Sequence, residues 1–366
     1  MLVAPLAGAL SDARGRKAFL LAGPAIAALA VLLIPLGSLG AAFPPFALVL
    51  VGAARLIEGL GSALSAPATL GLLAEGTDER PLQRGRLMSL FELSTSGGLA
   101  LGAVLGPILW QRLHLLAFAA LAALYLGASA VVARVREAPR GGRIGGAIDR
   151  RRSLSILAQR RLALFIPAWI AVNAIVGVWI TAQIVFVLTA RLHVPGQRFV
   201  GSLHGRPGAL SAILGGYVLW FSLCVAVWAV ALGRLPRLPV LLVTTVGAVL
   251  ASAGLILLNH GGAPVAFIPL VLAGVFLEAG FTPAALAYLA DASRAVARDR
   301  GLLMGLYSVI LGVGQLIGNV LGGIAAQAAY FDGLAYLTIL LAVVALAAVS
   351  ALMATQGRLD SRTGAA

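Results

Sequence analysis

Charged side chains are scarce in this sequence. Only 11% of the 366 residues are Asp, Glu, Lys or Arg, whereas a soluble globular domain carries roughly 25%. Hydrophobic residues make up 60%, and the mean hydropathy is +1.00. The composition therefore excludes a soluble binding module and predicts an all-α polytopic membrane protein.

Cysteine and the motifs of catalytic sites are also lacking. Cys224 is the one cysteine, so an intrachain disulfide cannot form. The sequence contains no H-E-x-x-H, no G-x-S-x-G, no Walker loop and no Cys/His spacing typical of a metal site. We therefore expect no enzyme, no cofactor and no metal, and an energy source other than direct use of ATP.

Basic residues outnumber acidic ones, 27 to 13, which gives a net charge of +14. The bases lie in short loops between apolar runs, a pattern that reports membrane topology and argues against a nucleic-acid partner. With the 12–17 turn assigned to the cytoplasm, the cytoplasmic connections hold 22 Lys and Arg and the outer connections hold 4. This bias predicts a cytoplasmic C-terminus and a multi-pass protein of the cytoplasmic membrane.

Ten apolar segments are each long enough to cross a bilayer. They are residues 18–38, 46–74, 86–109, 116–134, 162–189, 209–232, 239–258, 264–290, 302–325 and 334–354. Residues 1–10 are apolar too, but at 1.5 Å per residue they reach about 15 Å, half of a hydrocarbon core of about 30 Å. We therefore expect that the sequence as written lacks one helix and the first half of the next.

When the sequence is shifted by 216 residues and aligned with itself, parts of its two halves match. The shift places residues 84–111 on residues 300–327, with identities that include Arg84/Arg300, Gly98/Gly314, Gly102/Gly318, Gly106/Gly322 and Gln111/Gln327. A fixed offset over this length indicates an internal repeat, with the halves related by an axis along the membrane normal. We expect an N-terminal half at 1–134, a basic cytoplasmic linker at 135–161 and a C-terminal half at 162–366. The Arg150–Arg152 cluster of that linker either binds anionic lipid headgroups or belongs to a plain connection.

One short polar stretch lies between the first two apolar runs. Residues 8–17 read G-A-L-S-D-A-R-G-R-K and predict a tight turn. The stretch resembles the signature loop between helices 2 and 3 of the major facilitator superfamily, of the form G-x-L-a-D-r-x-G-r-k, with Gly8, Asp12 and Arg16 in matching places. The resemblance implies a cytoplasmic gate in which Asp12 meets the N-terminus of the 302–325 helix and Arg16 meets an acid, most simply Glu75.

Two charged residues lie inside the 46–74 segment. Residues 55–63 read R-L-I-E-G-L-G-S-A and resemble a second family signature, R-x-x-q-G-x-g-a-A, which proton-coupled drug antiporters carry. Arg55 and Glu58 are three residues apart and so share a helix face. Since a charge inside the bilayer is costly, the pair is either a proton relay, in which protonation of Glu58 frees Arg55, or a static pair that fixes packing.

Glycines recur every four residues in the 86–109 segment. Gly98, Gly102 and Gly106 form a close-packing ridge, and with Pro107 they resemble the third antiporter signature, G-x-x-x-G-P-x-x-G-G. Trp110 and Gln111 stand where that signature ends in glycines, which weakens the antiporter assignment. Packing is a sufficient explanation for this ridge and for the repeated one at residues 314–322.

Further polar residues lie within expected spans. Glu278, near the middle of its segment, is a proton-coupling candidate. The resemblance implies that it faces Arg55 and Glu58, because helices 4 and 10 line part of the family's cavity. Glu92 is another candidate unless it is simply solvated near the surface. Amide side chains are candidates to line a substrate cavity or to join helices. They are Asn173, Gln183, Gln315 and Asn319.

The resemblance implies the pseudo-symmetric twelve-helix bundle of the family, here with ten full helices, a partial one before them and no first helix. It implies a monomeric secondary transporter that works by alternating access, with a small molecule, protons and membrane lipids as partners. The second signature favours proton-coupled export of small amphipathic or cationic compounds. The alternatives are proton-coupled uptake of a sugar or organic acid, and a truncated membrane protein or sensor that does not transport.

Overall fold

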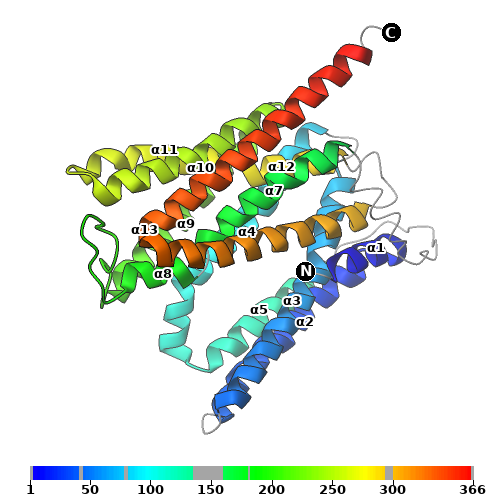
Figure 1. Cartoon of the computed structure of the whole chain (residues 1–366). Coiled ribbons are helices and arrows are strands. Elements are labelled where there is room, and N and C mark those ends of the chain that lie inside the picture. The colour runs from blue at the N-terminus through cyan, green and yellow to red at the C-terminus, as the bar shows by residue number, and fades with distance from the viewer. Residues whose placement is uncertain are drawn as a thin grey trace. The chain divides into compact units, whose positions relative to one another are not determined.

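The fold is almost entirely helical. A computed structural model describes residues 3–40, 44–77, 81–134, 160–179, 182–292 and 300–363 (Figure 1). The first half contains α1 (Ala4–Arg14), α2 (Lys17–Leu33), η1 (Pro35–Gly40), α3 (Pro44–Glu75), α4 (Pro81–Leu113) and α5 (Leu116–Ala133). The second contains α7 (Arg160–Trp179), α8 (Ala182–Thr189), α9 (Pro207–Ala231), α10 (Arg237–His260), η2 (Pro264–Phe267), α11 (Ile268–Glu278), α12 (Phe281–Ala292) and α13 (Arg300–Thr363). Residues 135–159 of the expected linker lie outside the described residues.

Among the described residues, eight stretches are long and apolar enough to span a membrane. They are Lys17–Gly37, Pro45–Glu75, Leu116–Ala133, Leu162–Thr189, Gly208–Ala231, Arg237–His260, Val265–Ala292 and Leu302–Thr355. The last contains two expected segments, so these stretches account for nine of the ten. The remaining segment, 86–109, is helical within the 33 residues of α4 but is not in this set. The chain is thus a multi-pass membrane protein, and the exact number of spans remains a prediction.

The polar turn at residues 8–17 is shorter than the sequence predicts. Helix α1 continues through Asp12 to Arg14, and only Gly15 and Arg16 are non-helical before α2 begins. Gly15 has φ +94°, a conformation that glycine adopts without steric cost. The helix therefore ends at this glycine, and the side chains of Asp12 and Arg16 are presented from rigid backbone.

Two expected segments contain breaks. The 264–290 segment is divided at Ala279 and Gly280 into α11 and α12. Because Pro283 lacks an N–H, it cannot bond the Ala279 carbonyl, which favours a break there. Helix α13 is interrupted at Ala329 and Tyr330, where φ is −144° and +52°, and this break separates the expected segments 302–325 and 334–354.

The described chain forms two compact units, and the division into two halves at the linker remains a prediction. One unit contains Met1–Glu79, Leu105–Leu157 and Ser293–Val309, and the other contains Arg80–Val104, Ala158–Ala292 and Ile310–Ala366. The first part of α13 thus belongs with α1, and the first part of α4 belongs with α9. Glycines allow both associations, since a Cβ on Gly305 would lie 2.5 Å from Pro5 Cα and one on Gly85 would lie 2.7 Å from the Leu232 carbonyl oxygen.

Within each unit, small residues allow the long helices to pack closely. In the first unit α2 crosses α3 at Gly23 and Gly61, where a Cβ on either residue would lie 2.6–2.7 Å from the other's carbonyl oxygen. In the second unit α10 crosses α11 at Gly247 and Gly274 in the same manner. Close backbone approach through glycine is how membrane helices gain packing contacts in the absence of a hydrophobic driving force.

Candidate functional site

Arg16 is the centre of a buried ionic site in the first unit. Its side chain is 0% exposed, and its Nη2 donates to Asp12 Oδ1 at 2.8 Å and to Glu75 Oε1 at 2.7 Å. Asp12 lies on α1 and Glu75 at the end of α3, so the guanidinium connects two helices. A buried charge requires such partners, because an unpaired one would be costly.

Gly71 on α3 makes room for this arginine. A Cβ at position 71 would overlap the Arg16 guanidinium, so every other residue type would displace it. The sequence analysis missed Gly71, since nothing in its local pattern separates it from other glycines in apolar helices. Only the fold brings α3 next to Arg16.

Asp12 also contacts the start of α13. Its Oδ2 accepts a hydrogen bond from the backbone N–H of Leu302 at 3.2 Å. Leu302 lies in the first turn of α13, where N–H groups have no intrahelical partner and the helix dipole favours a negative charge. Asp12 therefore binds Arg16 with one oxygen and a helix N-terminus with the other, and Gly8 is buried one turn earlier on α1.

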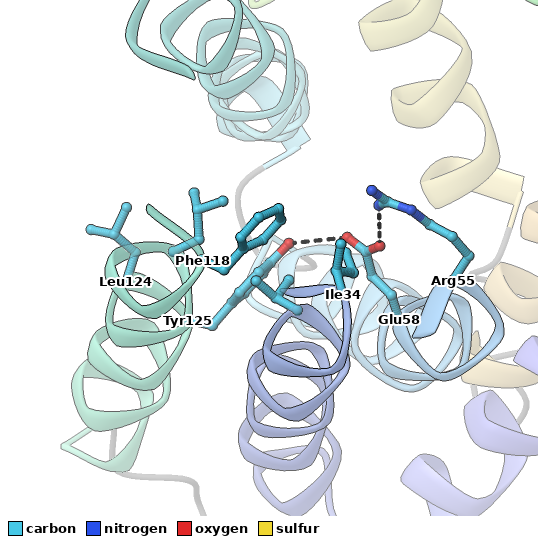
Figure 2. A pocket seen from close by; sticks show the side chains of 8 residues that line it. Ile34, Arg55, Glu58, Phe118, Leu124 and Tyr125 are labelled. Atoms are coloured by element: carbon cyan, nitrogen blue, oxygen red, sulfur yellow. Dashed lines mark hydrogen bonds and ion pairs between the residues drawn. The ribbon is translucent and has the colours of Figure 1, made fainter. Parts of the chain in front are cut away.

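Arg55 and Glu58 form a second ionic pair, on α3. Arg55 Nη1 lies 2.5 Å from Glu58 Oε2, with the arginine side chain 62% exposed and the glutamate 24%. The Tyr125 hydroxyl of α5 lies 3.5 Å from Glu58 Oε1, at the long limit for a hydrogen bond. Figure 2 shows the Arg55 guanidinium and the Tyr125 hydroxyl each directed at a different oxygen of the Glu58 carboxylate. The sequence analysis missed Tyr125, because only tertiary structure brings α5 to this point.

These three residues line a cavity of about 300 Å³ in the first unit. Its other walls are apolar and come from α2, the turn after it and α5 (Figure 2). They are Val31, Ile34, Phe118, Leu121 and Leu124. An apolar pocket with a few convergent polar groups is the usual form of a small-molecule site.

The remaining acidic candidates lie in the second unit. Glu278 ends α11, directly before the break at Ala279 and Gly280, and is half-buried. Glu92 lies on α4 and is also half-buried. The expectation that Glu278 faces Arg55 and Glu58 remains a prediction.

Two of the amide candidates join helices. Gln183 Nε2 on α8 donates to Asn319 Oδ1 on α13 at 2.6 Å. Asn173 is buried, and its Nδ2 donates to the Trp169 carbonyl one turn earlier on α7. The backbone of Gln315 packs against Gly177. Packing thus accounts for Asn173, whereas Oε1 of Gln183 is buried without a partner among the described residues and leaves an acceptor available.

The glycine ridges of α4 and α13 differ in their surroundings. Gly314 and Gly318 pack against α7. For Gly98, Gly102 and Gly106, no described atom of the unit to which each belongs lies within 4 Å of an added Cβ. The side chain of Pro107, also on α4, lies outside the described part of the structure.

A further polar cluster lies in the second unit, beside the break in α13. Asp332 accepts from Asn259 Nδ2 at 2.8 Å and lies 2.7 Å from His260 Nε2. Asn259 also accepts from the Phe199 N–H at 2.9 Å, so the cluster fixes the 190–206 connection. The sequence analysis missed it, although an acid beside Gly333 at a helix boundary is a signal that could have found Asp332. No group of residues suited to hold a metal ion occurs among the residues that the structure describes.

Comparisons with known proteins agree with this architecture. A family model for the Major Facilitator Superfamily matches residues 1–295 and residues 199–364. Among curated proteins, no significant sequence match is found.

Several solved structures share the fold. The facilitator FucP in its outward conformation has a TM-score of 0.71 at 16% identity, covering 96% of this chain and 86% of that one. The human organic anion transporter MFSD10 gives 0.68 at 18%, with 96% and 80% covered. A bacterial homologue of the iron transporter ferroportin gives 0.67 at 16%, with 96% and 87% covered. With a family model spanning most of its length, the chain belongs to the Major Facilitator Superfamily.

Proposed function

We propose that this protein is a proton-coupled secondary transporter of the cytoplasmic membrane that exports small amphipathic or cationic compounds. The observation that carries the proposal is the Arg55–Glu58 pair in the wall of an apolar cavity of about 300 Å³. An acid inside a span that faces a cavity marks a candidate proton pathway, and apolar walls suit an amphipathic substrate.

The coupling step follows from the geometry of the pair. When Glu58 is ionised, it holds Arg55 through a charge-assisted bond of 2.5 Å. Protonation removes the negative charge, so the arginine, which is 62% exposed, is released to another partner. Tyr125 can then donate to the neutral acid's carbonyl oxygen. Proton binding would thereby alter the charge that a substrate meets in the cavity.

The Arg16 site is the gate of this mechanism in our proposal. Asp12 connects the end of α1 to the start of α13, and Arg16 connects it to α3. Contacts that form in one of two conformations bias the equilibrium between them. The positive-inside distribution of Lys and Arg assigns this gate, and the C-terminus, to the cytoplasmic side.

Uptake of an organic acid or sugar by symport is the second candidate. The exposed guanidinium of Arg55 favours it, because an arginine released from Glu58 is suited to bind a carboxylate. Among the solved structures that share the fold are a fucose:proton symporter and an organic anion transporter. We place export first because the second antiporter signature is matched at Arg55, Gly59 and Ala63.

Transport by the full chain in vesicles with an imposed pH gradient tests the proposal. Ethidium serves as the amphipathic cation and lactate as the organic acid, with an internal pH dye as readout. Export predicts ethidium movement against the proton flow, and symport predicts lactate movement with it. No substrate-dependent proton flux for either compound would contradict the proposal and support a protein that does not transport.

Glu58→Gln tests the role of the pair in the same vesicles. We expect substrate-coupled proton movement to be lost while insertion and the unfolding temperature stay unchanged, because glutamine keeps the shape but cannot carry a proton. Tyr336→Phe is the control, since it removes a hydroxyl from an exposed side chain of α13 outside the cavity. Intact coupling in Glu58→Gln would exclude Glu58 as the relay.

A further inference from the structure

Asp332 lies at the centre of the polar cluster beside the break in α13. Its Oδ1 accepts a hydrogen bond from Asn259 Nδ2 at 2.8 Å, and its Oδ2 lies 2.7 Å from His260 Nε2. The side chain of Asp332 is 9% exposed, whereas that of His260 is 42% exposed. A largely buried carboxylate therefore has a titratable partner that water can reach.

The 190–206 connection is held to α10 through the same cluster. Asn259 accepts from the Phe199 N–H with its side-chain Oδ1 at 2.9 Å, and from the Arg198 N–H with its backbone carbonyl at 3.1 Å. Because the amide nitrogen of Asn259 donates to Asp332, the amide oxygen is directed at Phe199. Asp332 thus fixes the orientation of the side chain that binds the connection.

The connection also contacts α13 directly, at its break. Gln197 Nε2 donates to the Ala329 carbonyl at 3.1 Å, and the rings of Phe199 and Phe331 meet edge to face with their centroids 4.7 Å apart. Between these two contacts, Tyr330 has φ +52°, a conformation that is costly for a residue other than glycine. Opening of the connection would therefore remove contacts on both sides of a strained residue.

Two apolar side chains of the connection enter the core of the second unit. Val200 is 3% exposed and Leu203 is 9% exposed, and both belong to a buried cluster with Phe331 and Leu334. The backbone N–H groups of Gly201 and Leu203 donate to carbonyls of α8 at 2.9 Å. Val200 is thus shielded from water while the connection is closed, and its exposure would report local opening.

The pair of His260 and Asp332 is isolated from other charges. Where the connection approaches His260, a Cβ added to Gly196 would lie 3.9 Å from Nδ1, and η2 packs against the end of α10 through Phe267, which does not titrate. The other titratable groups of the connection and of the α13 break form no hydrogen bond or ion pair with either member within the described structure. They are Arg191, His193, Arg198, His204, Arg206 and Tyr330.

We propose that His260 and Asp332 form a proton-sensitive clasp that closes the 190–206 connection onto α10 and α13. The charge of a histidine side chain generally changes between about pH 5 and 8. A protonated imidazole pairs with the ionised carboxylate as a charge-assisted ion pair, whereas a neutral one offers a hydrogen bond at most. The clasp is therefore tighter on the acidic side of this range and looser on the alkaline side.

The orientation predicted from the loop charges assigns the 190–206 connection to the outer side of the membrane. The clasp would then respond to external pH, whatever the substrate or the direction of transport.

Opening of the connection can be measured with a cysteine at position 200. The full chain with Cys224→Ser and Val200→Cys is purified in detergent micelles and reacted with a fluorescent maleimide at about pH 5.5 and about pH 8, which span the titration of histidine. Cysteine is a small hydrophobe, and at a site that is 3% exposed its thiol reacts when the connection opens.

The same chain with His260→Gln is reacted in parallel. Glutamine can donate a hydrogen bond but cannot become charged, and the ratio of the two rates at each pH cancels the titration of the thiol itself. We expect the ratio of the parent rate to the His260→Gln rate to be about two- to five-fold smaller at the acidic pH, the range that a partly exposed ion pair supports.

Two further variants of this chain test the clasp. His193→Gln is the matched control, since it removes an exposed histidine of the same connection that does not contact Asp332, and it should keep the pH dependence of the parent. Asp332→Asn can still accept from Asn259 but lacks the charge, so it should react faster than the parent at the acidic pH. His260→Gln changes an exposed side chain and keeps the test valid if Asp332→Asn does not fold.

Two outcomes would overturn the proposal. A ratio of the parent rate to the His260→Gln rate that is the same at both pH values would show that the pair senses no proton. A thiol at Val200→Cys that reacts as fast as one at the exposed Ser202→Cys would show that the connection is not closed at either pH. Neither measurement uses a substrate or a proton gradient, so failure here is distinguishable from failure of the proposed function.

Discussion

Two arginines of the first unit each bind a glutamate, with nearly equal distances and very different surroundings. Arg16 lies 2.7 Å from Glu75 and is 0% exposed, and Arg55 lies 2.5 Å from Glu58 and is 62% exposed. Arg16 binds acids from α1 and α3, whereas the ion-pair partner of Arg55 is one turn away on its own helix.

The difference shows that burial and connectivity, rather than distance, decide what an ion pair does. Breaking a buried pair leaves an uncompensated charge, which costs about 3–5 kcal/mol. A pair exposed to water is worth about 0–1 kcal/mol, and we apply this value to Arg55 and Glu58 because they line a cavity that the proposed transport cycle opens to water. The Arg16 site is therefore suited to hold helices together, and the Arg55 pair is suited to exchange partners.

Arg16→Ala should give the largest effect on stability. It leaves Asp12 and Glu75 without their shared cation, so we expect a loss of about 3 kcal/mol or more in the free energy of unfolding. Thermal unfolding in detergent measures it. Arg16→Lys should retain part of the stability, because it keeps the charge but not the planar fork. An unchanged transition in Arg16→Ala would remove the distinction between the two sites.

Gly71→Ala should destabilise through the same arginine. The added methyl group would overlap the guanidinium, and such overpacking costs about 1–3 kcal/mol. Gly59→Ala on the same helix is the matched control, since no described atom lies within 4 Å of its added Cβ, and it should stabilise by up to about 1 kcal/mol. Equal effects of the two substitutions would show that α3 does not press against Arg16.

Asp12→Asn should slow transport and also lower stability, because it removes one of the two carboxylates that pair with the buried Arg16, while Glu75 remains. Asparagine can still accept from the Leu302 N–H, but the charge that the helix N-terminus favours is lost, worth about 0.3–1 kcal/mol. A shift of that size changes a conformational equilibrium by about two- to five-fold, so we expect turnover in vesicles to slow by about that factor. A variant that transports at the unaltered rate would exclude Asp12 from the gate.

Arg55→Gln should give the smallest change in stability. Its guanidinium is mostly exposed, so we expect less than about 1 kcal/mol in the unfolding measurement that registers Arg16→Ala. Substrate-coupled proton movement should nevertheless be altered in vesicles, because Glu58 loses its counter-charge. Should Arg55→Gln destabilise as much as Arg16→Ala, the pair would be a structural one.

Much of the fold was predictable because a membrane-spanning helix is marked by a local signal, a long run of apolar residues. Apolar runs of span length gave the helices α2, α3, α5, α9 and α10 within a few residues, since the bilayer selects for length and hydropathy. The breaks at Gly280 and Tyr330 are different. A proline or a glycine near each position permits a break, but tertiary packing decides whether the helix continues across it.

The candidate site was predictable only in part, because contacts between distant segments leave no local pattern in the sequence. Asp12 and Arg16 follow from a motif with fixed spacing, and Glu75 follows from the contact that the family resemblance implies. The structure brings the three together. Tyr125 and Gly71 belong to helices that are distant in sequence from the groups they contact, and no local pattern marks them. The order of burial, with Arg16 enclosed and Arg55 exposed, was likewise not visible in the sequence.

The sequence by itself determined that this chain is a helical membrane protein, that it contains a repeat, and where charged residues occur along its apolar segments. Hydropathy, residue spacing and loop charge are local quantities, so they can be read directly from the order of residues. The tertiary structure decided which charges pair, which glycines touch a neighbour and which ridge is occupied. Those facts depend on close approach between segments far apart in the chain, and Gly314, packed against α7, looks in sequence just like Gly98, which has no such neighbour in its unit.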